Sequence, residues 1–320
     1  MADSFTENRK PKTENTAPPR TVIFTADDFG LSAALNAAVA IAHSQGLLSC
    51  ASLMAAAPAT NEAREIALQH PDLCLGVHLT LIQGRAVLPP RHLPHLVDNN
   101  GNFPNDPVRA GWRYFWEPRL LPELRREMAA QIESLLAGGL KVWHLNGHLN
   151  LHLHPRIFPI VVELCREYGI AAVRLCREDW RLTLRLAPEG PLPKVMQGLI
   201  FAWLSRRAAR LAQAAGLAVN DHLFGLTQDG RMTEDYVLGL IPGLKPGVTE
   251  IYCHPATHAD VELKRWAPHY QRQAELQALL SPRIRRELTA AGIKVSDYRE
   301  LSQGKPLAGA TAASIRTGKR

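Results

Sequence analysis

The chain has 320 residues, of which 46% are hydrophobic and 21% are charged, a composition typical of a globular enzyme. No stretch approaches the ~20 apolar residues of a membrane-spanning helix, and residues 1–19 contain no apolar core of a secretion signal, so we expect a cytoplasmic protein. The net charge of +7 would suit an acidic partner, but aromatic residues make up only 6% and no nucleic-acid motif is present, so nucleic acid is not an expected partner.

Strand-like and helical runs alternate along most of the chain. The strand-like runs are 20–25, 49–54, 73–79, 141–145, 170–175, 249–253 and 294–296, and the helical ones are 33–44, 60–69, 122–137, 157–168 and 282–291. Repeated β–α units with apolar strands indicate a parallel sheet. At this length we expect an α/β fold of the distorted parallel (β/α) barrel type, TIM-barrel-like with inserted loops and helices. A doubly wound open sheet is the alternative. One barrel domain, 20–303, is expected between disordered tails at 1–19 and 304–320, the second of them basic.

The five cysteines are odd in number, widely spaced and embedded in apolar segments, which indicates reduced thiols that act as small hydrophobic side chains rather than a disulfide framework. They are Cys50, Cys74, Cys165, Cys176 and Cys253. No Cys-x-x-Cys pair argues for zinc–thiolate binding.

Two long stretches, 89–122 and 179–218, interrupt the alternation and are predicted to be irregular insertions. Within the second, residues 195–210 carry apolar side chains at helical spacing, and arginines follow them. Such a helix either packs on the barrel in the ordinary way or, together with the loop that holds Trp112 and Trp116, forms an apolar wall that contacts an anionic membrane.

Four histidines fall within twelve residues: His144, His148, His152 and His154. They follow the apolar run 139–143, which is expected to be part of a strand. Imidazole is the commonest protein metal ligand, so the cluster predicts a metal pocket at the end of that strand. A polar turn with surface histidines is the alternative.

Other polar side chains also fall where predicted strands end. They are Asp27 and Asp28, His78, Arg174 and His254. The carboxyl ends of the strands build the active site of a β/α barrel, so we expect these residues to converge on one mouth. Each has a structural alternative when taken alone: a helix cap, a core histidine, an ion pair or a turn.

Asp28, His78 and His148 supply one carboxylate and two imidazoles, a set that holds one divalent metal ion, with Mg or Zn expected. Such an ion polarises a carbonyl and lowers the pKa of bound water, and hydrolysis then needs a base and an acid. We expect Asp27 as the base and His254 as the acid. Because neighbouring side chains on a strand point to opposite faces, the backbone must already turn at this Asp-Asp pair, and Gly30 favours such a turn.

Several of these segments resemble, in order and spacing, the YdjC-like carbohydrate deacetylases. They are 25–31 with Asn36, 76–80, the 144–154 histidine cluster, 173–175 and 250–255, and the resemblance spans roughly 20–300. Segments 52–54, 88–90, 98–103 and 221–225 resemble the hopanoid-biosynthesis (HpnK-type) branch most.

The resemblance implies a barrel enzyme that hydrolyses the N-acetyl group of an acetamido sugar, with an N-acetylglucosaminyl hopanoid as the expected substrate. It implies the same base, acid and metal ligands, with Arg174 orienting or tuning Asp27 and with His152 as the substitute if His148 is not a ligand. Related barrels make a homodimer the expected assembly, and peripheral contact with the inner face of the membrane follows from a lipid substrate. The alternatives are a deacetylase of soluble chitooligosaccharides and a non-catalytic carbohydrate-binding barrel.

Overall fold

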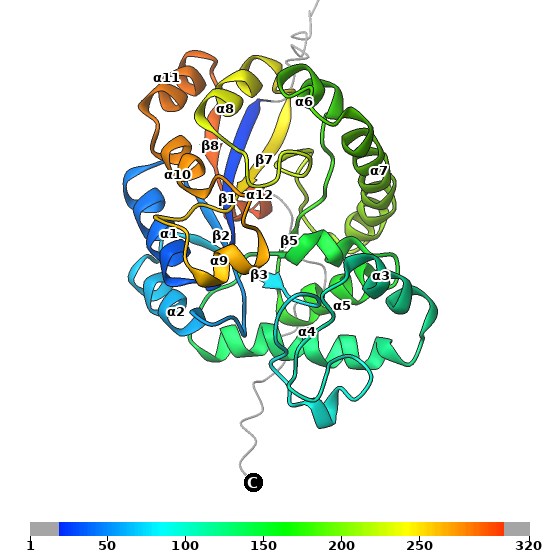
Figure 1. The fold of residues 1–320 in the computed structure, drawn as a ribbon. Coiled ribbons are helices and arrows are strands. Elements are labelled where there is room, and N and C mark those ends of the chain that lie inside the picture. Colours follow the sequence, from blue (N-terminus) through cyan, green and yellow to red (C-terminus); the bar gives the residue numbers. More distant parts are fainter. Residues whose placement is uncertain (1–18, 304–320) are drawn as a thin grey trace, which may run out of the picture.

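A parallel sheet forms the centre of the computed structural model, which describes residues 19–303 (Figure 1). Within these residues the strands are β1 (Arg20–Phe29), β2 (Cys50–Leu53), β3 (Cys74–Leu79), β4 (His144–Gly147), β5 (Ala172–Val173), β6 (His222–Phe224), β7 (Gly247–Cys253) and β8 (Lys294–Ser296). Strand β1 is rich in β-branched and aromatic residues, which favour extended backbone, and eight of its ten side chains are buried.

The strand order is β5-β4-β3-β2-β1-β7-β6, with β8 beside β1, and every pair is parallel. Isolated parallel bridges join Ala172 to Ala218 and Glu178 to Leu223, so the two ends of the sheet approach each other. The predicted distorted parallel barrel is confirmed. The predicted tails, apart from residue 19, lie outside the described residues.

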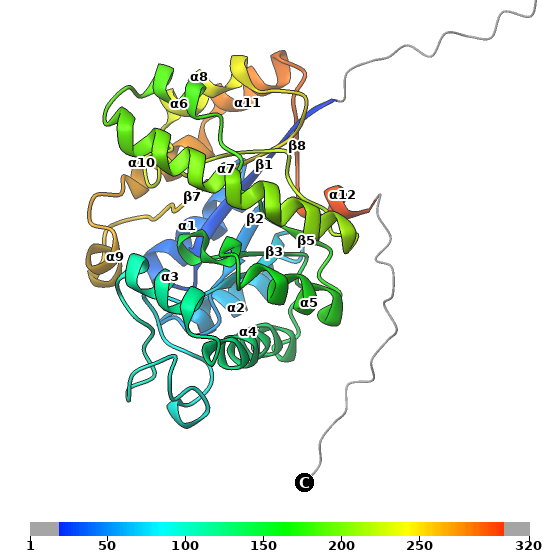
Figure 2. The ribbon, with the colours of Figure 1, turned by 90° about the vertical axis from the view of Figure 1, so that its right-hand side faces the viewer.

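Helices cover the outside of the sheet (Figures 1 and 2). They are α1 (Ala33–Gln45), α2 (Thr60–Gln69), α3 (Pro107–Trp116), α4 (Leu120–Ala137), α5 (Phe158–Tyr168), α6 (Trp180–Leu186), α7 (Pro191–Ala214), α8 (Glu234–Leu240), α9 (Val261–Trp266), α10 (Arg272–Leu280), α11 (Pro282–Ala290) and α12 (Tyr298–Ser302), with 3-10 turns η1 (Pro90–His92), η2 (His148–Leu153) and η3 (Ile241–Gly243).

The insertion at 179–218 is not irregular, because α6 and α7 occupy most of it. The helix expected over 195–210 is confirmed as part of α7. The proline and glycine residues at 188–193 separate these helices, and Pro191 occupies the first turn of α7, where its missing N–H leaves no bond unmade. The insertion at 89–122 also contains a helix, α3, capped by Asp106. Strand β6 escaped prediction because three residues are too few to show an alternating pattern.

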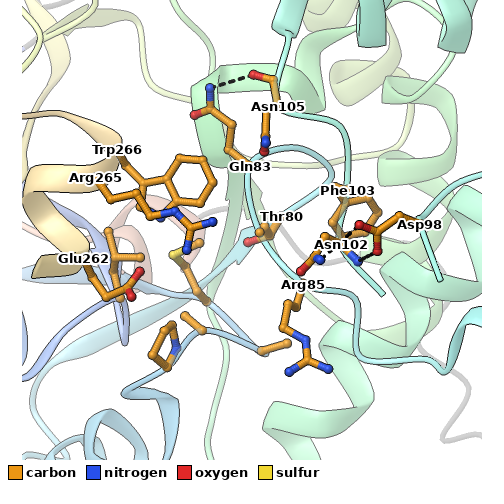
Figure 3. Close-up of a pocket in the computed structure, with 16 residues that line it drawn as sticks. Thr80, Gln83, Arg85, Asp98, Asn102, Phe103, Asn105, Glu262, Arg265 and Trp266 are labelled. Atoms are coloured by element: carbon orange, nitrogen blue, oxygen red, sulfur yellow. Dashed lines mark hydrogen bonds between the residues drawn. The ribbon is translucent and has the colours of Figure 1, made fainter. Parts of the chain in front are cut away.

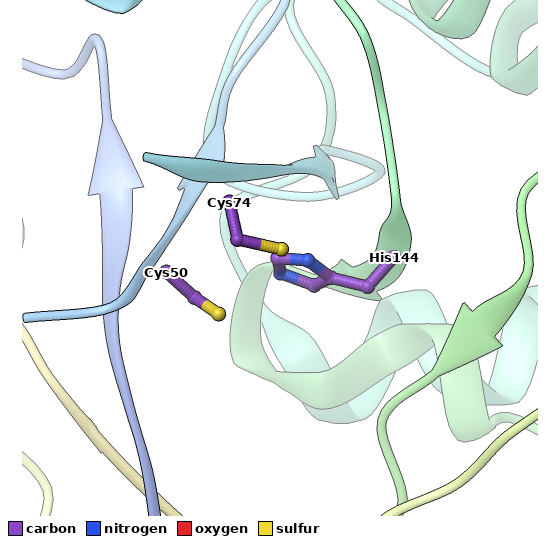
Figure 4. A group of neighbouring side chains, drawn as sticks. All are labelled: Cys50, Cys74 and His144. Carbon is purple, nitrogen blue, oxygen red and sulfur yellow. The ribbon is translucent and has the colours of Figure 1, made fainter. Parts of the chain in front are cut away.

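A second, smaller core closes the amino-terminal end of the barrel, where Cys50, Cys74 and His144 begin strands β2, β3 and β4 (Figure 4). Their potential ligand atoms lie within 4.8 Å of one another. The His144 ring stacks on Tyr298 with centroids 4.4 Å apart, and its Nε2 lies 3.2 Å from Ser52 Oγ. Burial raises the pKa of Cys74, but hydrogen bonds from Cys50 and His144 outweigh it and lower this pKa to about 6. All five cysteines are free and buried, as predicted.

The His144 ring also lies directly over Gly76, where an added Cβ would come within 2.3 Å of Nε2. Gly76→Ala should therefore lower the free energy of unfolding by about 1–3 kcal/mol, the usual cost of overpacking a core. Urea denaturation measures this. Gly111→Ala is the matched control, because a Cβ there meets nothing within 4 Å and alanine favours the α3 helix by up to about 1 kcal/mol. Equal stability of Gly76→Ala and the wild type would contradict this packing.

Candidate active site

The carboxyl ends of the strands bring together the six residues that strand-end position predicted. All are at least nine-tenths buried, and they come from β1 and from the segments in or after β3, β4, β5 and β7: Asp27, Asp28, His78, His148, Arg174 and His254. The convergence expected of a β/α barrel mouth is therefore present.

The four histidines of the 144–154 cluster do not share one pocket. His148 Nδ1 lies 2.8 Å from Asp28 Oδ1, at the mouth. His152 faces elsewhere, because its Nε2 donates to the backbone oxygen of Arg174 at 3.1 Å, and burial lowers its pKa to about 3. His144 lies at the opposite end of the barrel, and His154 packs against α3. The structure thus places His148, and not His152, beside Asp28, and the prediction of one pocket for the whole cluster was wrong.

The turn that lets both aspartates face the mouth lies at Asp28 itself. This residue has φ 59°, and the β1–β2 register shifts between Ala26 and Phe29. Aspartate tolerates this left-handed region better than most residues. Gly30, with φ 97°, continues the turn, and its N–H donates to Asn36 Oδ1 at 2.8 Å.

Asp28, His78 and His148 form a group that fits a divalent metal ion. Their potential ligand atoms lie within 4.8 Å of one another, and His78 Nε2 is 3.2 Å from Asp28 Oδ1. A neutral His78 that donates from Nδ1 to Asn146 Oδ1, 2.8 Å away, keeps the Nε2 lone pair toward Asp28, as metal-binding histidines do. Burial raises the pKa of Asp28, but His148 and His78 outweigh this effect and hold it well below its usual value.

Arg174 joins two buried carboxylates behind this group. Its guanidinium donates to both oxygens of Asp27, with Nη2 2.9 Å from Oδ1, and its Nε lies 2.9 Å from Glu250 Oε2. Thr25 and Tyr298 each donate a hydroxyl to Glu250 at 2.6 Å. Burial raises the pKa of Asp27, but the charge and hydrogen bonds of Arg174 more than reverse this and hold it below its usual range. Asp27 is therefore an oriented, ionised carboxylate.

His254 faces a further acid, Asp229, across a distance of 3.3 Å from Nδ1 to Oδ1. Tyr270 donates its hydroxyl hydrogen to the other oxygen of Asp229, and the backbone N–H of His254 donates to Glu275 Oε2 at 2.7 Å. Burial lowers the pKa of His254 to about 4 and raises that of Asp229 well above its usual value. Burial thus disfavours the charged form of both groups and favours a neutral His254 imidazole beside a protonated Asp229 carboxyl.

Sequence reasoning missed Asp229, Asn146 and Glu250 as parts of the site. Asp229 follows β6, so the strand-end argument would have found it if this short strand had been recognised. Asn146 stood inside the histidine cluster, and its Nδ2 donates to Asp27 Oδ1 at 3.1 Å. Glu250 is a charged residue within an otherwise apolar strand, and this position was the available signal for a buried ion pair.

Two adjoining cavities open at the mouth. The smaller, of about 50 Å³, is lined by the site residues. The larger, of about 450 Å³, lies between α9 and the segment after β3, and Gln83 and Trp266 line both (Figure 3). Its wall combines apolar side chains with polar ones, which include Arg85, Asp98, Asn102, Glu262 and Arg265. A polar molecule held in the larger cavity could therefore extend one group to the site.

Arg174→Met should lower the free energy of unfolding by about 3–5 kcal/mol at pH 7, because it leaves Asp27 and Glu250 buried without their cation. The depressed pKa of Asp27 means that its contribution is present above about pH 4 and is lost as pH falls further. The deficit of the variant should therefore shrink on acidification.

Urea denaturation of metal-free protein between pH 3 and 7 measures this. Arg125→Met is the control, since Arg125 forms exposed ion pairs on α4 and its loss should change stability by less than about 1 kcal/mol. A loss for Arg174→Met no larger than that of the control would show that the buried network contributes little.

Comparisons with known proteins agree with this architecture. The chain matches the family described as YdjC-like protein over residues 21–290. A carbohydrate deacetylase of Geobacillus stearothermophilus is 31% identical over 88% of this chain and 98% of its own length, and one of Vibrio cholerae serotype O1 is 30% identical over 88% and 96%.

Among solved structures, a protein of Enterococcus faecalis V583, named for cellobiose-phosphate cleavage, superposes with a TM-score of 0.69 and 26% identity. The superposition covers 89% of this chain and 99% of that one. The family match over residues 21–290, together with relatives of this identity and coverage, shows that the chain belongs to the YdjC-like family.

Proposed function

We propose that this protein is a metal-dependent N-deacetylase that hydrolyses the acetamido group of an amino sugar. The observation that carries this proposal is one buried pocket that combines a metal-ligand set, an ionised carboxylate and a histidine whose Nδ1 lies 3.3 Å from an acid. The relatives named carbohydrate deacetylases support the substrate class.

Asp28, His78 and His148 would hold the ion. When bound there, a divalent ion polarises the acetyl carbonyl and lowers the pKa of water next to it. Two imidazoles in the set favour a zinc-like ion over magnesium, which prefers oxygen ligands.

Asp27 would take the proton of the attacking water. The bidentate contact with Arg174 fixes its carboxylate plane, and the Asn146 amide donates to the same carboxylate at 3.1 Å. These contacts keep Asp27 ionised, which is the state that a base requires before reaction.

His254 would protonate the amine as the C–N bond breaks. The proton of the Asp229 carboxyl would move to the imidazole, and the resulting carboxylate would stabilise the imidazolium that donates to the amine. Asp229 is thus a positioning residue that acts through His254.

The larger cavity would receive the sugar. The polar side chains of its wall suit hydroxyl groups, and Trp266 offers an aromatic face on which a sugar ring can pack. The resemblance to the HpnK-type branch favours an N-acetylglucosaminyl hopanoid as substrate. Soluble chitooligosaccharides are the alternative, while the paired arrangements of Asp27 and His254 argue against a purely binding role, because binding needs neither a base nor an acid.

Removing a proposed ligand should remove the ion from this pocket. Asp28→Asn and His148→Ala should each weaken zinc binding, whereas His152→Ala should retain it, because His152 faces Arg174. Equilibrium dialysis against zinc measures the affinity and stoichiometry. His92→Ala is an exposed control, and Cys50→Ser with Cys74→Ser identifies any zinc held at the other end of the barrel. Retained binding in His148→Ala together with a loss in His152→Ala would reverse the ligand assignment.

Asp27→Asn should lower kcat roughly 10²–10⁴-fold while zinc stays bound, since the amide cannot accept a proton. Asp229→Asn should lower kcat less and move the alkaline limb of the pH profile to lower pH, because the protonated form of His254 loses its anionic neighbour. The assay is acetate release from N-acetylglucosaminyl hopanoid and from chitobiose, with the exposed Asp72→Asn as the matched control. Failure of the zinc-loaded wild type to release acetate from either substrate would reject the proposed function.

A further inference from the structure

Exposed apolar side chains gather on two neighbouring helices, α3 and α7. Among the described residues, ten of the fourteen large hydrophobic side chains that are exposed belong to these helices. This set, called the α3–α7 surface below, comprises Val108, Trp112, Phe115, Trp116, Leu192, Met196, Leu199, Ile200, Trp203 and Leu211. Isolated exposed apolar residues are ordinary, but ten of them on two neighbouring helices, three of them tryptophans, mark an interaction site.

Unlike an ordinary surface helix, α7 leaves most of its large apolar side chains exposed. Its buried positions are small residues, Gly198, Ser205, Ala208 and Ala212, whereas Trp203 on the other face is 59% exposed. Helix α3 likewise buries Ala110 and Tyr114 and leaves its larger apolar residues outside. Of the two interpretations of 195–210, packing on the barrel holds for the small residues and for Phe201 and Leu204. The other large apolar side chains, Met196, Leu199, Ile200 and Trp203, remain exposed.

The two helices lie side by side in both views (Figures 1 and 2) and are linked to the active site. The His154 ring, just after η2, packs edge-on against Phe115 of α3 with centroids 6.1 Å apart, and η2 also contacts α7. Turn η2 begins at His148, and Leu149, which is exposed, lines the catalytic pocket. Turn η2 thus connects the α3–α7 surface to the pocket mouth.

The charge on these helices is entirely positive. Together α3 and α7 contain six lysine and arginine residues and no aspartate or glutamate. Arg206 and Arg210 continue the helical face of Met196, Leu199 and Trp203, at spacings of three or four residues. The two arginines also line a groove of about 600 Å³, whose wall adds three cations, Arg177, Arg181 and Lys245, and two carboxylates, Glu178 and Asp179.

We propose that the α3–α7 surface docks on an anionic lipid bilayer. Tryptophan and aliphatic side chains would enter the boundary between headgroups and acyl chains, and the arginines would meet lipid phosphates, as in interfacial amphipathic helices. A second copy of the chain fits this face less well, because α3 and α7 offer no carboxylate with which the arginines of a partner copy could pair. Among the described helices none is long and apolar enough to cross a membrane.

Docking would bring the catalytic pocket close to a sugar carried by a membrane lipid. This role of the surface, unlike the docking itself, rests on the proposed function. Docking itself needs no substrate and no metal. If the protein binds vesicles but releases no acetate, the proposed deacetylase activity is rejected and the proposed docking surface stands. If it releases acetate but does not bind vesicles, the docking surface is rejected and the activity stands.

Flotation of the full chain with vesicles tests the proposal. The wild type should bind vesicles of phosphatidylglycerol and phosphatidylcholine at low salt, bind pure phosphatidylcholine at least tenfold less, and dissociate in high salt, because the arginine contribution is screened. The triple variant Trp112→Ser, Trp116→Ser, Trp203→Ser should bind roughly tenfold or more weakly, since each change removes apolar area that enters the bilayer. Each of Arg206→Gln, Arg207→Gln and Arg210→Gln should weaken binding roughly fivefold.

Leu68→Ser and Val261→Ser are matched controls, because these side chains are exposed outside the α3–α7 surface, and they should bind as the wild type does. Thermal melting verifies that every variant is folded. Three results would overturn the proposal: no binding of the wild type to anionic vesicles, tryptophan variants that bind normally, or a wild-type dimer that the tryptophan changes dissociate while vesicles are ignored.

Discussion

The site depends on one buried guanidinium. Arg174, fully buried, bridges Asp27 on β1 and Glu250 on β7, and Tyr298 of α12 and Thr25 complete the hydrogen bonds of Glu250. Buried charges are unfavourable unless each is paired, so these segments keep their stability only in one relative arrangement. That arrangement fixes the start of the Asp-Asp turn and therefore the position of the neighbouring metal-ligand group.

The surroundings of the two proton-handling groups of the pocket give them different protonation states. Arg174 makes Asp27 a stable anion, whereas burial dominates at His254 and Asp229 and favours the neutral form of each. Asp28, with His78 and His148, lies between these two environments. A pocket that holds a fixed anion at one side and a mobile proton at the other is suited to hydrolysis, in which one group accepts a proton and another donates one.

Strand-end position in the sequence was enough to bring six residues to one mouth, because parallel strands present their carboxyl ends to the same side of a barrel. The same reasoning missed Asp229, because β6 has only three residues and was not recognised as a strand. It also failed for His144 and His154, because residues that are close in sequence can have side chains that point to different parts of the structure. The sequence showed that apolar residues recur at helical spacing in 195–210, but not whether that face of the helix packs on the barrel or faces solvent. The orientation of the helix depends on the small residues, such as Gly198 and Ala208, that pack on the barrel.

The central claim is that Asp28, His78 and His148 hold the ion at the carboxyl end of the barrel, beside Asp27. Anomalous X-ray scattering from zinc-soaked crystals locates the ion without any assay of activity. The account predicts one dominant peak about 2.0–2.2 Å from the carboxylate oxygen of Asp28 and the ring nitrogens of His78 and His148. Zinc found only among Cys50, Cys74 and His144, or coordinated by His152 in place of His148, would contradict it.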